Sequence, residues 1–151
     1  MTRRHTEAEL YPLGRPKDYP AIRKASDLYD AGIAQLRKLE ARFGLQVWDR
    51  RPDAPEEYRQ HVEYVENVLR SALDEAWERF HVDSLQAMAP AIIETIRDGG
   101  GRLTLSALRV RCRPAGSHLT CYYWMAIRRL RKVPGLKVAE RARGIEVDDP
   151  D

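Results

Sequence analysis

The sequence predicts a mainly α-helical protein with a small β-hairpin near its C-terminus. Two observations support this fold class. Between residues 25 and 83, apolar side chains recur at spacings of three and four, which is the period of an amphipathic helix. From residue 84 onward, shorter apolar segments are separated by glycine and proline. We therefore divide the chain into an N-terminal arm (1–24), a helical hairpin (25–83) and a C-terminal domain (84–148).

The N-terminal arm is expected to be extended, because Pro12, Gly14, Pro16 and Pro20 oppose a helix. No apolar run follows its basic start, so we expect no secretory signal. No segment of the chain approaches the roughly 20 apolar residues that cross a bilayer. These features predict a cytoplasmic protein that makes no contact with a membrane.

The first helix of the hairpin is predicted from about Ser26 to Phe43. Ser26 and Asp27 are residue types that cap a helix N-terminus, and Gly44 suits the position just after a helix end. The spacing of its apolar residues predicts that one face is buried. That face contains Leu28, Gly32, Leu36, Leu39 and Phe43.

The second helix is predicted to be longer, from about Pro55 to His81. Proline is favoured in the first helical turn, and Glu56 and Glu57 complement the positive end of the helix dipole. Its apolar positions come close to a heptad repeat. The two helices pair within one chain or with a second copy, and we expect a homodimer. These helices are also the expected docking site for any protein partner.

The C-terminal domain is predicted to contain a helix, a short strand, two further helices and a β-hairpin. Asp83 or Ser84 is expected to cap the first helix, which Pro90 interrupts and Gly99–Gly101 ends. The strand at 102–105 precedes a helix that Thr104 or Ser106 caps. The remaining elements are a turn at 113–116, a third helix from His118 to about Lys132 with Ser117 as its cap, and strands at 136–141 and 145–147 joined by a tight turn.

This order of elements resembles the winged-helix variant of the helix-turn-helix superfamily over about residues 85–148. The landmarks are the glycine run, the turn from Pro114 to Ser117 and the Ala142-Arg143-Gly144 tip between the last two strands. The resemblance implies that the third helix lies in the major groove of double-stranded DNA. It also implies that the basic tip, or wing, lies along the minor groove or the phosphate backbone.

Positive charge is concentrated in this part of the chain. Residues 102–143 contain eleven basic side chains and one acidic side chain, Glu140, whereas the whole chain has a net charge of +3. A concentrated positive charge attracts polyanions and releases their counterions. The basic residues are Arg102, Arg109, Arg111, Arg113, Arg128, Arg129, Arg131, Lys132, Lys137, Arg141 and Arg143.

A helical wheel centred on Leu119 predicts which side chains of the third helix reach a ligand. Tyr123, Ala126, Ile127 and Leu130 lie on the core side of this wheel, and Trp124 and Arg128 lie on the outer side. Trp124 is expected either to stack on an unpaired base or to pack against protein. The predicted nucleic-acid-binding residues are Arg102, Arg109, Arg111, Arg113, Ser117, His118, Trp124, Arg128, Arg131, Lys132, Arg141 and Arg143.

We expect a non-enzymatic protein that binds double-stranded DNA, acting as a dimeric transcriptional regulator. Gly99–Gly101 lacks the lysine of a phosphate-binding loop, and the basic segment is nearly free of carboxylates. Cys112 and Cys121 fit no zinc pattern, so we expect no metal and no cofactor. The alternative is a non-catalytic adaptor subunit of a nucleoprotein or defence-related complex, whose winged helix binds protein or RNA. Burial of Trp124 in a hetero-complex would favour the adaptor.

Overall fold

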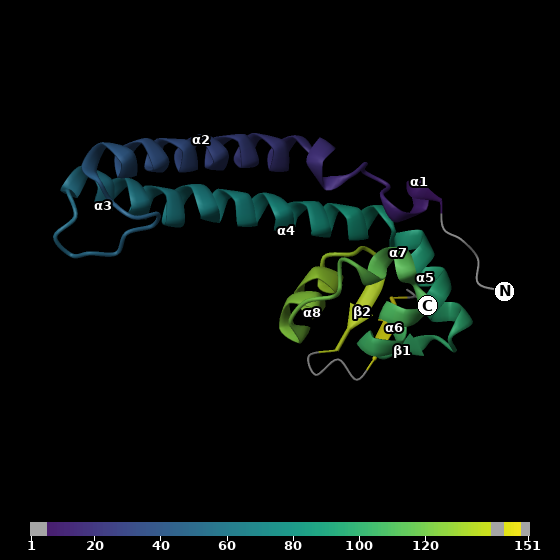
Figure 1. Ribbon diagram of the computed structural model, residues 1–151. Helices are drawn as coiled ribbons and strands as arrows, with labels where there is room; N and C mark the ends of the chain where they lie inside the picture. Colours follow the sequence, from purple (N-terminus) through teal and green to yellow (C-terminus); the bar gives the residue numbers. More distant parts are fainter. Residues whose placement is uncertain (1–5, 140–143, 149–151) are drawn as a thin grey trace. The chain divides into compact units, whose positions relative to one another are not determined.

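The computed structural model describes residues 6–139 and 144–148, and the chain divides into two compact units (Figure 1). We call residues 16–78 the helical-hairpin unit, and residues 1–15 with 79–151 the C-terminal unit. The protein is mainly α-helical with a small antiparallel sheet, as the sequence predicts. The division differs from the expected boundary after residue 83, and it falls within helix α4 (Arg70–Ala87).

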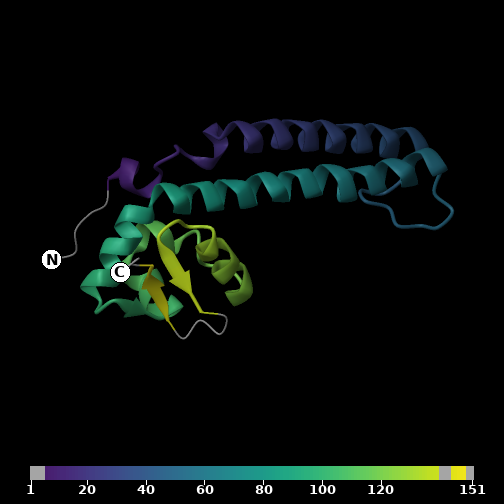
Figure 2. The ribbon, with the colours of Figure 1, turned by 180° about the vertical axis from the view of Figure 1, so that it is seen from behind.

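The helical-hairpin unit is formed by helix α2 (Pro20–Phe43) and a second helical run beside it. This run begins with α3 (Glu56–Glu63), continues through a π-helical segment, η2 (Tyr64–Leu69), and passes into α4. In both views α2 lies antiparallel to α3 and η2 (Figures 1 and 2). The core between them contains Leu36, Leu39, Ala54, Tyr58, Val62, Val65 and Leu69.

Gly32 sets the closest approach of α2 to η2. A Cβ atom at this position would lie 2.5 Å from Leu69 Cδ1 and 3.1 Å from Val65 Cγ2. The His61 ring nitrogen Nε2 lies 3.1 Å from the Gly32 carbonyl oxygen. A larger side chain at residue 32 would therefore push α2 away from η2 and disturb the packing around Leu69 and Val65.

Glu40 organises the connection between α2 and α3. Although it is buried, its carboxylate accepts hydrogen bonds from the Tyr58 hydroxyl at 2.7 Å, the Trp48 amide at 2.8 Å and Arg37 Nη1 at 2.8 Å. Burial alone would raise the pKa of Glu40, but these hydrogen bonds outweigh it and lower the pKa. Burial and the bond to Glu40 raise the pKa of Tyr58 to about 12.

The N-terminal segment is not the extended arm that its prolines predict. Helix α1 (Glu7–Leu10) is capped by Thr6, and a 3-10 turn, η1 (Pro16–Asp18), precedes α2. Helix α2 begins at Pro20 instead of Ser26. Proline is tolerated in the first turn because the backbone N–H that it lacks would have no hydrogen-bond partner within the helix there. Its C-terminal end at Gly44 is confirmed by a left-handed φ of 65°.

Two further details of the hairpin depart from the prediction. Leu28 is exposed, although Gly32, Leu36 and Leu39 are buried as expected. The second helical run continues past His81 to Ala87, so Asp83 and Ser84 lie inside α4 and cap no helix. Ser84 is buried there, and neither glycine nor proline interrupts the helix before Pro90.

The C-terminal unit combines a three-stranded sheet with short helices, which lie behind and beside the strands in Figure 2. The strand order is β1-β3-β2, both pairings are antiparallel, and Ile145 pairs with Leu103 on one side and Val138 on the other. In chain order the elements are α5 (Ala89–Asp98), β1 (Arg102–Leu103), α6 (Leu105–Arg111), α7 (Arg113–Gly116), α8 (Tyr123–Arg131), β2 (Leu136–Val138) and β3 (Ile145–Val147).

The core of this unit draws on every one of its main elements. It includes Leu85, Ile92, Ile96, Leu108, Leu119, Leu130 and Ile145, all of them inaccessible to solvent. Thr104 caps α6, since its hydroxyl accepts a hydrogen bond from the Ala107 amide at 3.1 Å, and this is one of the two caps that the sequence offers. The expected strand at 102–105 consequently ends at Leu103.

The segment before α8 departs furthest from the prediction. Residues 113–116 form a short helix instead of a turn, and the third helix begins at Tyr123, so Ser117 does not cap it. His118 and Leu119 are buried in an irregular connection whose Leu119 amide donates to the Gly116 carbonyl. Burial of these two side chains requires the chain to turn inward, which delays the helix by five residues.

Candidate nucleic-acid interface

The outer face of α8 carries a basic and aromatic stripe. Trp124, Arg128 and Arg131 follow at spacings of four and three and are exposed, as is Lys132 at the helix end. The opposite face, with Ala126, Ile127 and Leu130, is buried. Two of these side chains form a cation–π contact, since the Arg128 guanidinium carbon lies 4.9 Å from the centroid of the Trp124 ring. We call these four exposed residues the α8 stripe.

Three consecutive aromatic residues, the N-cap Tyr122 and the first two residues of α8, are all exposed. Tyr122, Tyr123 and Trp124 are 73%, 49% and 56% exposed, respectively. The wheel centred on Leu119 wrongly places Tyr123 on the core side. That wheel assumes a helix from residue 118, whereas Tyr123 is the first residue of α8 and has no preceding helical turn against which to pack.

The segment of the chain that contains the α8 stripe is strongly basic. The sequence contains no aspartate or glutamate between residues 99 and 139. Within residues 6–139 and 144–148, no ion pair joins Arg111, Arg113, Arg128, Arg131 or Lys132 to a carboxylate. Arg102 differs, because its Nε lies 3.8 Å from a Glu146 carboxylate oxygen on the neighbouring strand β3.

Arg109 has a structural role that its sequence context does not predict. Its Nε donates to the Leu119 carbonyl at 2.8 Å and its Nη2 to the Cys121 carbonyl at 3.3 Å. The side chain is half-buried and joins α6 to the connection before α8. Two of its nitrogens thus donate to backbone carbonyls, so Arg109 has an internal role in addition to the phosphate contact that the sequence predicts.

Arg129 was not among the candidate residues, yet it supports the same connection. It is only 6% exposed, and its Nη1 donates to the His118 carbonyl at 2.7 Å. Arg109 and Arg129 therefore hold residues 118–121 from two sides. The burial of Arg129 depends on its bond to the His118 carbonyl, which helical periodicity alone does not predict.

His118, a predicted binding residue, is 4% exposed and does not reach the surface. Its Nδ1 lies 2.9 Å from His81 Nδ1, and its ring packs edge-on to Phe80. Burial, together with the charges of His81 and Arg129, lowers the pKa of His118 to about 4, so the ring is neutral near pH 7. In the described part of the chain, no third His, Cys, Asp or Glu joins this pair in a metal-binding cluster.

The remaining predicted site residues have different outcomes. Ser117 is exposed but lies in the turn before α8. Arg111 and Arg113 are exposed on α6 and α7, whereas the wing-tip residues Arg141 and Arg143 lie outside the described residues. The structure therefore places Trp124, Arg128, Arg131 and Lys132 together on α8 and at its C-terminal end. His118 is buried, and Arg109 donates to backbone carbonyls.

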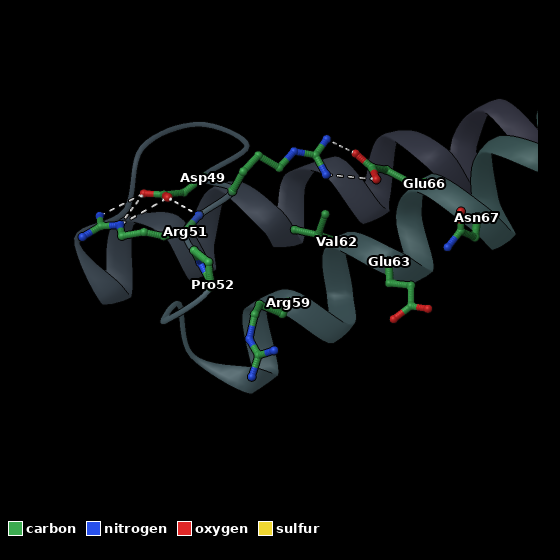
Figure 3. Close-up of a pocket in the computed structure, with 9 residues that line it drawn as sticks. Asp49, Arg51, Pro52, Arg59, Val62, Glu63, Glu66 and Asn67 are labelled. Carbon is green, nitrogen blue, oxygen red and sulfur yellow. Dashed lines mark hydrogen bonds and ion pairs between the residues drawn. The ribbon is translucent and has the colours of Figure 1, made fainter.

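A surface pocket of about 360 Å³ lies in the helical-hairpin unit (Figure 3). Its arginines are already engaged: Arg50 pairs with Glu66, Arg51 pairs with Asp49, and Arg59 donates to the Ala54 carbonyl. Charges of both signs line this pocket, so it lacks the excess of basic residues that the segment containing the α8 stripe has. The stripe is therefore the stronger candidate for binding a polyanion.

Arg109→Ala is expected to lower the free energy of unfolding of the C-terminal unit by about 1–2 kcal/mol, because two carbonyls lose a charged donor. Arg113→Ala provides the matched control, since Arg113 is exposed and should change stability by less than about 0.5 kcal/mol. Denaturant unfolding of the two variants measures the difference. Equal stability of the two variants would contradict the assigned role of Arg109.

Comparison with known proteins gives no relative: no family model matches the chain, and neither a curated protein nor a solved structure matches it. Among the helices of the described residues, none has the length and apolar character needed to span a membrane.

Proposed function

We propose that the C-terminal unit is a winged-helix domain that binds double-stranded DNA without catalysis, with α8 as its recognition helix. The observation that carries this proposal is the α8 stripe, in which Arg128, Arg131 and Lys132 are exposed on one face and lie in a segment free of carboxylates. Arginine can bond guanine through two parallel donors or clamp a phosphate. A basic helix face of this kind suits the major groove of DNA.

The arrangement of elements supports the assignment of α8. The order of helix, strand, helices and hairpin matches the order that the sequence led us to expect, and β3 lies between β1 and β2. In the superfamily that this order resembles, the last helix before the hairpin is the one that meets DNA. The packing of Ala126, Ile127 and Leu130 into the core fixes which face of α8 remains free.

We extend this proposal to a regulator of transcription that acts as a homodimer. The helical-hairpin unit leaves Leu28, Tyr64 and Val68 exposed, and apolar side chains of this size are suited to pairing with a second copy. A dimer would present two α8 helices to two half-sites on DNA. Analytical ultracentrifugation of the full chain tests this part, and a monomer at micromolar concentration would refute it.

Arg128→Ala and Arg131→Ala should each weaken binding to duplex DNA by about ten-fold, because each removes one base or phosphate contact. Fluorescence polarisation with a labelled random duplex measures the effect. Arg23→Ala is the matched control, since Arg23 is an exposed arginine in the helical-hairpin unit and should leave the affinity unchanged. The logarithm of the binding constant should also fall linearly with the logarithm of the salt concentration.

Two results would contradict duplex binding. One is the same affinity for wild type, Arg128→Ala and Arg131→Ala. The other is binding that does not change between about 50 and 200 mM salt, since phosphate contacts release counterions.

A second candidate function is a non-catalytic adaptor, in which the C-terminal unit binds a protein or RNA within a nucleoprotein complex. The specific observation in its favour is the exposure of Tyr122, Tyr123 and Trp124. Tyrosine and tryptophan are enriched in interfaces, and base-pair recognition by arginines leaves three such rings without a role. The two functions differ in a direct measurement. The adaptor predicts that the purified chain ignores duplex DNA and that Trp124 becomes shielded from acrylamide quenching in the complex.

A further inference from the structure

The aromatic run at the start of α8 is the feature that duplex binding leaves unexplained. Tyr122, Tyr123 and Trp124 are consecutive and exposed. They lie at the N-terminal end of α8, where the α8 stripe begins. Aromatic rings contribute more apolar contact area than other side chains, and an exposed run of them is typical of a binding surface. The chemistry beside the rings indicates what covers them.

The charge around these rings favours nucleic acid over protein. The Arg128 guanidinium lies over the Trp124 ring, Arg131 follows one turn later, and no carboxylate occurs between residues 99 and 139. An apolar protein surface would remove water from both guanidinium groups without replacing it, which is costly. A nucleic acid supplies phosphates for the arginines and flat bases for the rings.

We propose that Trp124, supported by Arg128, is a stacking platform for one unpaired nucleobase. This inference rests on the proposed function, because the α8 stripe must hold the phosphate backbone before a base can reach Trp124. In uninterrupted duplex the faces of every base are already stacked on their neighbours, so none is free for the platform. The C-terminal unit therefore prefers nucleic acid with a local interruption of base pairing.

The experiment compares two labelled DNA hairpins of equal length, one fully paired and one with a single bulged adenine. Polarisation with the full chain should show about ten-fold tighter binding to the bulged hairpin, which is the effect expected of one stacked base. Because stacking alone does not distinguish sugars, the same pair is also made in RNA. Preference for the bulge in either pair supports the platform, and the pair that binds more tightly identifies the nucleic acid.

Three variants separate stacking from charge. Trp124→Ala should remove the preference for the bulge, and any remaining affinity for the paired hairpin then comes from the basic residues Arg128, Arg131 and Lys132. Trp124→Phe should retain part of the preference, because phenylalanine keeps a ring face. Trp77→Ala, which removes an exposed aromatic ring from the helical-hairpin unit, should leave the preference unchanged.

Fluorescence gives a second readout that is independent of affinity. Stacking of a base on Trp124 should quench part of the tryptophan emission when the bulged hairpin is added, and Trp124→Phe should abolish this component. Equal wild-type affinity for bulged and paired hairpins overturns the platform but leaves duplex binding intact. Failure to bind any hairpin at low salt overturns both, and favours a protein partner for the aromatic run.

Discussion

Replacing Glu40 by alanine is expected to lower the free energy of unfolding of the helical-hairpin unit by about 3–5 kcal/mol. The Tyr58 hydroxyl, the Trp48 amide and the Arg37 guanidinium all lose their acceptor, and Tyr58 is fully buried. Burying polar groups without partners costs about 1–3 kcal/mol each, and removing one member of a buried charged network costs more. Denaturant unfolding followed by fluorescence in a Trp77→Phe, Trp124→Phe background, which leaves Trp48 as the only tryptophan, measures the loss locally.

Two further variants show whether the hydrogen bonds are responsible. Glu40→Gln keeps one carbonyl oxygen and should cost about half as much as Glu40→Ala. Tyr58→Phe should destabilise the wild type more than it destabilises Glu40→Ala, because the hydroxyl has already lost this acceptor. If the two substitutions are instead additive, the network does not act as a unit and the account of the connection is wrong.

Acidification from pH 6.5 to pH 4 is expected to destabilise the C-terminal unit by up to about 3 kcal/mol through His118 alone. Its pKa is about 4 in the folded protein against 6.5 in the unfolded chain. Between these values the unfolded chain binds a proton that the folded chain does not, so stability falls as the pH falls. Below pH 4 both forms are protonated and this contribution stops changing. A shift of one pKa unit corresponds to 1.36 kcal/mol.

The effect should be strongest at the connection that leads into α8. A protonated His118 would face the His81 ring at 2.9 Å and the Arg129 guanidinium, with Phe80 at its side. Hydrogen exchange of the α8 amides at pH 6.5 and pH 4.5 measures the local opening. His118→Gln, which cannot titrate, should flatten the pH dependence, and an unchanged slope in this variant would assign the effect to other groups.

Local sequence signals were sufficient for much of the fold. Gly44 ends α2 because glycine adopts the left-handed conformation without strain, and Thr104 caps α6 because its short hydroxyl reaches the Ala107 amide. The spacing of Leu36 and Leu39 correctly predicted their burial. Each of these features depends on residues that are close in the sequence.

The errors arise where distant residues decide the outcome. Ser117 is a good cap by composition, but Arg109 and Arg129 bind the carbonyls of residues 118–121 and hold them in an irregular path. Ser84 likewise has a capping side chain, yet tertiary packing buries it within α4. Propensity cannot predict contacts of this kind, because their partners lie about ten or more residues away.

The candidate site shows the same division. Periodicity alone predicts the outward stripe of Trp124, Arg128 and Arg131, since it needs only an α-helix with one buried face. Helical periodicity does not predict whether an arginine side chain is exposed to solvent or donates to a backbone carbonyl. Arg109 and Arg128 both lie in the same basic segment of the sequence. Arg109 bonds a carbonyl and Arg128 stays exposed because the backbone of residues 118–121 passes beside Arg109.

The two internal arginines have a consequence for how this unit responds to its medium. Added electrolyte screens cations at the surface far more than it screens partly or fully enclosed groups. Arg109 and Arg129 donate to carbonyl dipoles inside the unit, whereas Arg128 and Arg131 are open to dissolved ions. The loop that leads into α8 should therefore keep its shape in concentrated electrolyte. Under the proposed function, salt would then weaken the binding of a strand to α8 and release it without a rearrangement of the fold.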